Sequence, residues 1–265
     1  AVILDVVYNH LGPEGNYLAE FGPYFSRKHH TPWGDAVNFD GPQSEHVRRF
    51  MIENAIYWLD EFHLDGLRLD AVHFMIDDRH PDVLAEIRAA VTQFADTLDR
   101  QVHLIAESNI YDSALLETGD QPSYDAIWCD CLMHSLYTLG VPDLQLTHRV
   151  YRGSSDLAEV LQHGYLYAGV RPVRCTPEQR AELHPHGDAW KHISSFVTAL
   201  QTHDAIGNHP HGKRLHQLTS KEFQRAAAAL ALVSTITISI IIGVVLCSDP
   251  HLPFEVGYVH LHHQQ

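Results

Sequence analysis

Residues 66–73 read GLRLDAVH, and this stretch indicates the fold. Two leucines alternate with Arg68 and Asp70, which is the period-two pattern of a strand whose two faces differ. Helical patterns are predicted on either side, at about 45–61 and 81–98. A strand between two helices of this length is typical of a parallel sheet covered by helices.

The same rhythm of strand and helix continues along the chain. Further strands are expected at about 1–7, 102–107, 124–128, 195–202 and 235–246, with helical segments within 131–163 and at about 219–233. A Gly- and Pro-rich loop is expected at 10–44 and an irregular insertion at 169–190. This alternation predicts an α/β fold, and the six strands fit most of a (β/α)8 TIM barrel. We expect an incomplete barrel over 1–246, lacking the first two strands, followed by a divergent tail at 247–265.

The composition narrows the possible partners and the compartment. The chain of 265 residues has 33 Asp and Glu against 18 Lys and Arg, a net charge of −15. No nucleic acid is expected as a partner, because its phosphates require clustered cations. The four cysteines contain no CxxC pair, which favours a reducing, cytoplasmic location.

One uncharged segment, 226–247, has almost the length of a membrane span. Its first part, AAAALALV at 226–233, continues a helix that begins with polar residues. Its second part, at 234–246, is rich in β-branched residues, with Ser and Thr interleaved. We therefore expect a buried helix followed by a buried strand, and no membrane association.

Polar residues stand at the ends of four predicted strands, where a parallel barrel places its active site. These residues are Asp5, Asn9 and His10, then Arg68 and Asp70, then Glu107, and finally His203 and Asp204. Arg68 lies two residues before Asp70 and should keep that carboxylate ionised and oriented, as a nucleophile requires. Glu107 follows an apolar run that favours its protonated form, which suits a proton donor.

Each of these signals alone also has a structural explanation. A strand-end Asp is commonly a helix cap or turn residue, and a strand Arg–Asp pair is commonly a structural ion pair. His203 alone would commonly be a hydrogen-bonded core histidine. The ordered combination on successive strands is far more specific than any single member.

Four ordered segments resemble the signature regions of the α-amylase superfamily of glycoside hydrolases. They are DVVYNH at 5–10, GLRLDAVH at 66–73, the strand-terminal Glu107 and QTHD at 201–204. Longer stretches, such as HLGPEGNY at 10–17 and HHTPWGDAVNFDG at 29–41, are similar to the maltooligosyltrehalose trehalohydrolase family within it. This resemblance covers about residues 1–233.

The resemblance implies a retaining double displacement that needs no cofactor and no metal. Asp70 matches the nucleophile, Glu107 the general acid/base, and Asp204 the carboxylate that orients the sugar. The implied substrate is maltooligosyltrehalose or a related α-glucan, cut at the α-1,4 bond next to its terminal trehalose. Residues implied around the sugar are Asp5, Asn9, His10, Arg68 and His203, and Trp33 and Trp128 are expected to stack on sugar rings.

The chain departs from the family pattern at two places. Cys131 stands where the family usually has a second acidic residue. After the predicted helix at 219–233, the segment 238–265 only faintly resembles the expected strand ending, and the β-sandwich domain expected to follow is absent from the sequence.

Three other functions remain open. A glucan branching enzyme or an amylase would use the same three carboxylates. Imidazoles could instead bind a metal, either in the run His203, Asp204, His209 and His211 or in the tail at His260, His262 and His263. A non-catalytic glucan-binding protein could use Trp33, Trp128, Tyr165 and Tyr167, although core burial explains each of these aromatics equally well.

Overall fold

The computed structural model describes residues 1–98, 100–117, 123–144, 151–167, 189–233 and 238–239. The chain divides into two compact units. The first unit comprises Ala1–Ser108 and Ala114–Ile127, and the second comprises Asn109–Ser113 and Trp128–Gln265.

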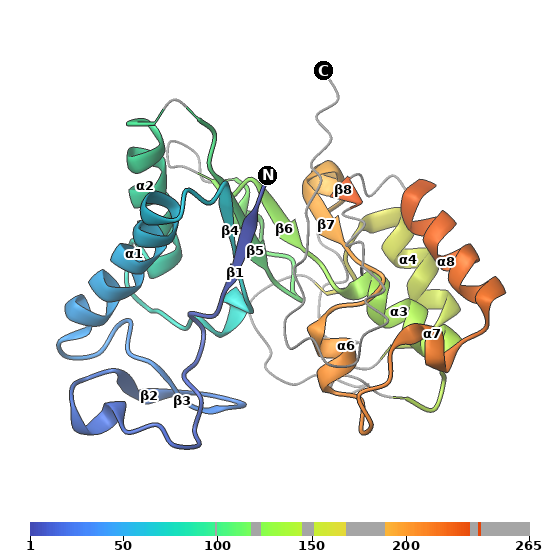
Figure 1. The fold of residues 1–265 in the computed structure, drawn as a ribbon, viewed down its shortest axis with the longest axis horizontal. Helices are drawn as coiled ribbons and strands as arrows, with labels where there is room; N and C mark the ends of the chain where they lie inside the picture. The colour runs from blue at the N-terminus through green and yellow to red at the C-terminus, as the bar shows by residue number, and fades with distance from the viewer. Residues whose placement is uncertain (99, 118–122, 145–150, 168–188, 234–237, 240–265) are drawn as a thin grey trace. The chain divides into compact units, whose positions relative to one another are not determined.

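The first unit combines a parallel sheet, two helices and a small hairpin (Figure 1). Its elements are β1 (Ile3–Val6), η1 (Leu18–Glu20), β2 (Phe25–Thr31), β3 (Gly34–Val37), α1 (Ser44–Glu61), β4 (Gly66–Leu69), η2 (Val72–Phe74), α2 (Val83–Ala95) and β5 (His103–Glu107). Two further elements, η3 (Ser113–Leu115) and β6 (Ala126–Trp128), carry residues of both units.

Strand β4 lies between β1 and β5 in this sheet and is parallel to both. The register pairs Asp5 with Arg68, and Leu69 with Ala106. All four residues of β4 are buried. Gly66 is required there, because a Cβ at this position would lie 2.3 Å from the carbonyl oxygen of His103.

Helices α1 and α2 pack against each other in this unit (Figure 1). Residues of α1 at a spacing of four are at most 3% exposed, which gives the helix an apolar stripe. These residues are Val47, Met51, Ala55 and Leu59. The start of α2 is capped by Asp82, whose carboxylate accepts a hydrogen bond from the Ala85 N–H at 2.9 Å.

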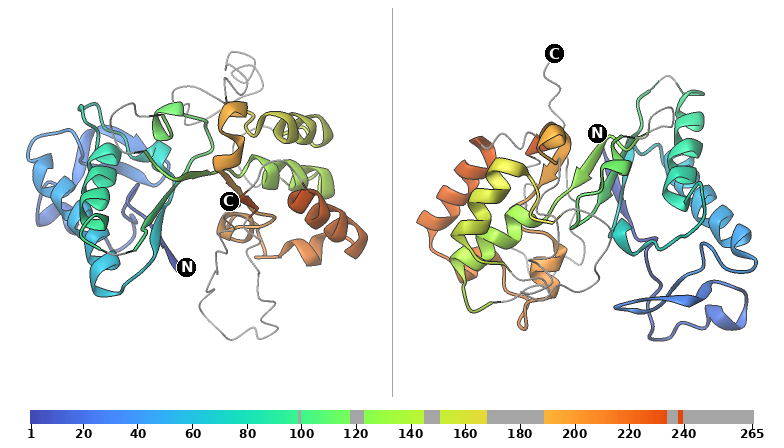
Figure 2. Two further views of the ribbon diagram at one scale, coloured as in Figure 1. Left: turned by 90° about the horizontal axis from the view of Figure 1, so that it is seen from above. Right: turned by 180° about the vertical axis from the view of Figure 1, so that it is seen from behind.

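The second unit contains helices around an apolar cluster and two parallel strands. Its elements are α3 (Cys131–Gly140), α4 (Ser154–His163), η4 (Ala189–Ser195), β7 (Phe196–Thr198), α6 (His203–Gly207), α7 (Leu215–Leu218), α8 (Lys221–Val233) and β8 (Ile238–Ser239). Helices α3 and α4 lie side by side, and β7 pairs with β8 (Figure 2). Met133, Tyr137, Ala205 and Leu215 form the buried cluster that joins α3, α6 and α7.

The predicted α/β fold with parallel strands is confirmed. The predicted helices at 45–61, 81–98 and 219–233 correspond to α1, α2 and α8, and the first five predicted strands contain β1, β4, β5, β6 and β7. The loop expected at 10–44 is wrong in one respect, because β2 and β3 form an antiparallel hairpin within it.

Several predictions lie outside the described residues. They are the tail at 247–265, its histidines His260, His262 and His263, most of the insertion at 169–190 and most of the strand at 235–246. The predicted barrel boundary at 246 therefore stays a prediction. Among the described residues, no helix combines the length and the apolar character that a membrane crossing requires.

Candidate active site

Arg68 lies at the centre of a buried charge cluster in the first unit. Its side chain is 5% exposed, and Nη1 donates to both carboxylate oxygens of Asp5, at 2.7 and 2.8 Å. The same nitrogen donates to Oδ1 of Asp70 at 2.8 Å. The β1–β4 register makes this possible, because it places Asp5 directly beside Arg68 on the neighbouring strand.

Asp70 follows the last residue of β4 and is fixed from two sides. Arg68 binds its Oδ1, and Asn9 Nδ2 donates to its Oδ2 at 2.9 Å. Asn9 also donates to the backbone carbonyl of Asp70 at 2.8 Å. The Asp70 side chain is 13% exposed, so its carboxylate is held in one orientation with limited access to solvent.

Glu107 ends β5 and lies at the same level of the sheet as Asp70. Leu69 pairs with Ala106 in the β4–β5 register, so the next residue of each strand is one of the two acids. The Glu107 side chain is 4% exposed, and its Oε2 lies 3.9 Å from Arg68 Nη2. The backbone N–H of Ala71 donates to the same Oε2.

The backbone turns sharply immediately after Asp70. Ala71 has a φ of +41°, in the left-handed region that side chains other than glycine seldom adopt. This conformation directs the Ala71 N–H to Glu107 rather than along the strand. A sterically costly conformation between two acids marks this turn as a functional position.

The charges around Arg68 determine its protonation. Burial alone would lower the pKa of its guanidinium, but the negative charges of Glu107, Asp5 and Asp70 outweigh this effect and raise the pKa well above the ordinary arginine value. Arg68 is therefore a permanent cation that compensates the neighbouring carboxylates.

An aromatic platform adjoins Asp70. The His10 and Trp33 rings are stacked, with centroids 4.2 Å apart, and Trp33 meets Phe74 edge-on at 5.2 Å. His10 Nδ1 lies 2.6 Å from Asn9 Oδ1, and that oxygen can only accept, so Nδ1 carries the proton. Burial lowers the pKa of His10, although the negative charge of Asp70 opposes this shift.

The QTHD segment in the second unit separates into an anchored half and an exposed half. The Gln201 side-chain oxygen accepts hydrogen bonds from Tyr137 Oη at 3.0 Å and from the Leu215 N–H at 2.7 Å. In contrast, the side chains of His203 and Asp204 are 58% and 41% exposed at the start of α6. His203 Nε2 lies 3.6 Å from Asp204 Oδ1.

The aromatic candidates for sugar stacking differ in exposure. Trp33 is 38% exposed. Trp128 is 5% exposed, and its indole N–H donates to Asp130 at 2.9 Å. Tyr165 and Tyr167 are fully buried, which favours the core alternative for both. Sugar stacking by Trp33 and Trp128 stays a prediction.

The predicted metal ligands His209 and His211 are close together but do not form a ligand set. Their ring centroids are 6.1 Å apart, and His209 Nδ1 accepts the backbone N–H of His211 at 3.0 Å. Within the part of the chain that the structure describes, neither belongs to a group of three ligating atoms within 4.8 Å of one another.

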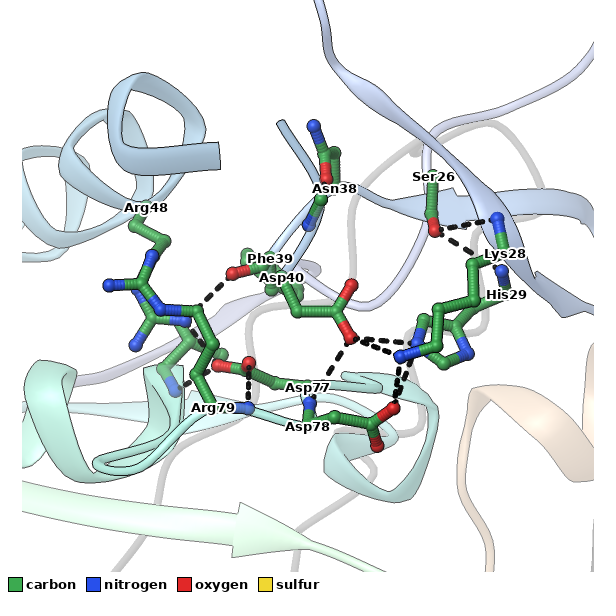
Figure 3. Close-up of polar contacts among 12 residues, drawn as sticks. Ser26, Lys28, His29, Asn38, Phe39, Asp40, Arg48, Asp77, Asp78 and Arg79 are labelled. Atoms are coloured by element: carbon green, nitrogen blue, oxygen red, sulfur yellow. Dashed lines mark hydrogen bonds and ion pairs between the residues drawn. The ribbon is translucent and has the colours of Figure 1, made fainter. Parts of the chain in front are cut away.

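The sequence analysis missed a second charge cluster, beside the hairpin. We call Lys28, His29, Asp40 and Asp78 the hairpin anchor; it is drawn in Figure 3. The TPWG sequence at 31–34 could have indicated the hairpin that carries this cluster, because a glycine is suited to a turn between two strands. In the structure Gly34 has a φ of +123°.

The comparisons with known proteins find similar glycoside hydrolases. The chain is 38% identical to the malto-oligosyltrehalose trehalohydrolase of Saccharolobus solfataricus over 88% of its length and 40% of that protein. It is 39% identical to the enzyme of the same name from Arthrobacter ramosus, over 92% and 42% of the two chains. The chain thus spans about two fifths of these curated relatives. No protein-family model matches it.

A solved structure supports the same conclusion for the fold. A protein from Salmonella typhimurium, provisionally named alpha amylase, matches 89% of this chain and 40% of its own with a TM-score of 0.71 and 32% identity. This likeness confirms the predicted barrel class of the fold.

Proposed function

We propose that the chain is part of an enzyme of the α-amylase superfamily of glycoside hydrolases and carries the catalytic carboxylates of a retaining α-glucan hydrolase; its likeness to malto-oligosyltrehalose trehalohydrolases supports this. Asp70 is the nucleophile and Glu107 the general acid/base. The proposed substrate is maltooligosyltrehalose, cut at the α-1,4 bond next to the terminal trehalose.

The observation that carries this proposal is the β4–β5 register. Leu69 pairs with Ala106 on neighbouring parallel strands, and Asp70 and Glu107 are the next residues of those strands. Such strands lie about 4.8 Å apart, close to the roughly 5–5.5 Å that separates the two carboxyl groups of retaining glycosidases. Inverting enzymes need a wider gap, because a water molecule must fit between the catalytic base and the sugar.

The contacts of each acid suit its proposed role. Asp70 is oriented by Arg68 and Asn9, which positions its carboxylate for attack on the anomeric carbon. Glu107 is buried, so its carboxyl can hold the proton that the departing glycosidic oxygen receives. The same carboxylate then takes a proton from the water that hydrolyses the covalent glycosyl-enzyme.

Asp204 is proposed as the third carboxylate, on the strength of its place in the QTHD segment. The anchoring of Gln201 fixes the start of this segment, and the exposed Asp204 carboxylate can accept hydrogen bonds from sugar hydroxyls. His203, Asp5 and His10 are proposed to contact or support the same sugar.

The test is incubation of the chain with maltooligosyltrehalose, followed by NMR of the fresh products. We expect free trehalose and a new reducing end in the α configuration. Asp70→Asn should lower turnover by about 10³-fold or more, without changing the circular dichroism of the protein. Glu53→Gln is the matched control, because it removes one exposed carboxylate of a surface ion pair and should leave turnover unchanged.

Three results would contradict the proposal. A β-configured product would show inversion, and new α-1,6 bonds would show a branching enzyme. Glucan binding without any turnover, unaffected by Asp70→Asn, would show a non-catalytic binding protein.

A further inference from the structure

The hairpin reaches the candidate active site through its tip. Trp33 lies in the turn between β2 and β3 and stacks on His10 at 4.2 Å. His10 is hydrogen-bonded to Asn9, and Asn9 donates to Asp70. The position of the tip is therefore linked to the nucleophile by one ring contact and two hydrogen bonds.

The hairpin anchor holds the same hairpin on strand β2, away from its tip (Figure 3). Asp40 is its centre, with a side chain only 4% exposed. Its Oδ2 lies 2.8 Å from His29 Nε2 and 3.3 Å from Lys28 Nζ. The backbone N–H of Asp78 donates to the same oxygen at 3.3 Å.

Asp78 completes the anchor from a third segment. Lys28 Nζ donates to its carboxylate, and His29 Nε2 lies 3.6 Å from it. Lys28 and His29 belong to β2, Asp40 follows β3, and Asp78 lies between η2 and α2. The anchor thus binds the hairpin to the segment that follows the nucleophile strand.

A buried ion pair next to the anchor fixes the two segments that flank the hairpin (Figure 3). Arg48, with a side chain 3% exposed, forms an ion pair with Asp77, whose side chain is fully buried. The Arg48 guanidinium also donates to the Phe39 carbonyl at 2.9 Å. Asp77 precedes Asp78, and Phe39 precedes Asp40. The contacts of Arg48 therefore hold the backbone next to both carboxylates of the anchor.

Opposite charges face one another within the anchor. Burial alone would raise the pKa of Asp40, but hydrogen bonds from His29, from the Asp78 N–H and from Lys28 hold it below its ordinary value. The Lys28 ammonium bridges the two carboxylates, at the place where a bound cation would otherwise be needed. The Asp40 carboxylate makes its contacts with Lys28, His29 and the Asp78 N–H through Oδ2, while its buried Oδ1 has no hydrogen-bond partner among the described residues. The contacts made through Oδ2 join three segments of the first unit, which gives the anchor a mechanical role.

We propose that Asp40, acting through Lys28, His29 and Asp78, is a positioning residue that holds Trp33 on His10 and thereby sets how tightly the sugar is bound. The part that concerns the sugar rests on the proposed function. The part that concerns Trp33 rests on the contacts of the first unit alone.

The first test measures amide hydrogen exchange of the hairpin by mass spectrometry. Asp78→Asn should not prevent folding, because the Asp78 side chain is 61% exposed. We expect exchange in residues 25–37 to rise about three- to tenfold, with a larger rise in Asp40→Asn. Exchange in α2 should stay unchanged, and Glu53→Gln should have no effect on either region.

The second test follows Trp33 directly in the chain labelled with 5-fluorotryptophan. The chain has four tryptophans, and the loss of one fluorine resonance in Trp33→Phe identifies that of Trp33. Lys28→Met should shift and broaden this resonance, whereas Lys28→Arg, which keeps the cation, should restore it.

The third test separates binding from chemistry in the hydrolysis of maltooligosyltrehalose. Asp78→Asn and Lys28→Met should raise KM about three- to tenfold, with kcat changed less than twofold, and Lys28→Arg should restore KM. If the unsubstituted chain shows no turnover, the proposed function fails, while the exchange and fluorine measurements still decide the positioning role.

Two outcomes would overturn the inference. One is that neither the amide exchange of the hairpin nor the fluorine resonance of Trp33 changes in Asp40→Asn and Asp78→Asn. The other is equal acceleration of exchange throughout the first unit, which would make the anchor a general stabiliser with no specific effect on Trp33.

Discussion

At the scale of single residues, Arg68 has the largest electrostatic role in the first unit. One guanidinium contacts Asp5 and Asp70 and lies within 3.9 Å of Glu107. Removing the cation leaves three carboxylates close together, one of them almost wholly buried. Uncompensated buried charge of this kind is strongly destabilising.

Arg68→Met should therefore lower the free energy of unfolding by about 3–5 kcal/mol, as measured by urea denaturation at neutral pH. Arg49→Met is the matched control, because Arg49 is 71% exposed and pairs with Glu53 on the surface of α1. It should change the free energy by less than about 0.5 kcal/mol. Equal effects of the two variants would disprove the role assigned to Arg68.

His10 gives the first unit a defined dependence on pH. Burial lowers its pKa below the reference value of 6.5, against the opposing charge of Asp70. The folded state then binds a proton less readily than the unfolded chain. The resulting stability is present above that reference value and is lost as the pH falls through the lower pKa of the folded state.

The comparison of His10→Phe with the unsubstituted protein isolates this effect, because phenylalanine keeps a ring against Trp33 but does not titrate. The difference in unfolding free energy between the two proteins should favour the unsubstituted protein more at pH 8 than at pH 5. A difference independent of pH would show that His10 does not titrate in this way.

At the scale of elements, strand β4 depends on a close approach of backbones. Gly66→Ala would place a Cβ 2.3 Å from the His103 oxygen and 2.7 Å from Ile3 Cδ1, so β1 and β5 would have to move apart. We expect the free energy of unfolding to fall by about 2 kcal/mol or more. Gly12→Ala should be neutral or slightly stabilising, because nothing lies within 4 Å of its added Cβ. Calorimetry of both variants checks this expectation.

The β2–β3 hairpin shows what sequence patterning misses at this scale. Residues 25–31 read FSRKHHT, with no regular alternation of apolar and polar side chains. This strand is stabilised by its partner β3 and by ion pairs with Asp40 and Asp78, which are distant from it in the chain. Periodicity detects buried faces, and β2 has a single buried residue, Ser26.

At the scale of the molecule, contacts within one strand could be predicted individually, whereas contacts between strands could be predicted only as a common location at the strand ends. The Arg68–Asp70 pair follows from their spacing of two along β4. The Arg68–Asp5 pair and the common level of Asp70 and Glu107 depend on register between strands far apart in sequence. That register is fixed by packing around Gly66, which the sequence does not display as a pattern.

The Arg68 cluster also bears on which sugars can approach it. One permanent cation is set against three carboxyl groups, within a chain whose formal charge is −15. Phosphorylated or uronic-acid units would meet electrostatic repulsion at the strand ends, whereas neutral glucose units would not. We therefore expect the residues that orient the proposed nucleophile to act also as a charge filter that discriminates between plain and anionically substituted glucans.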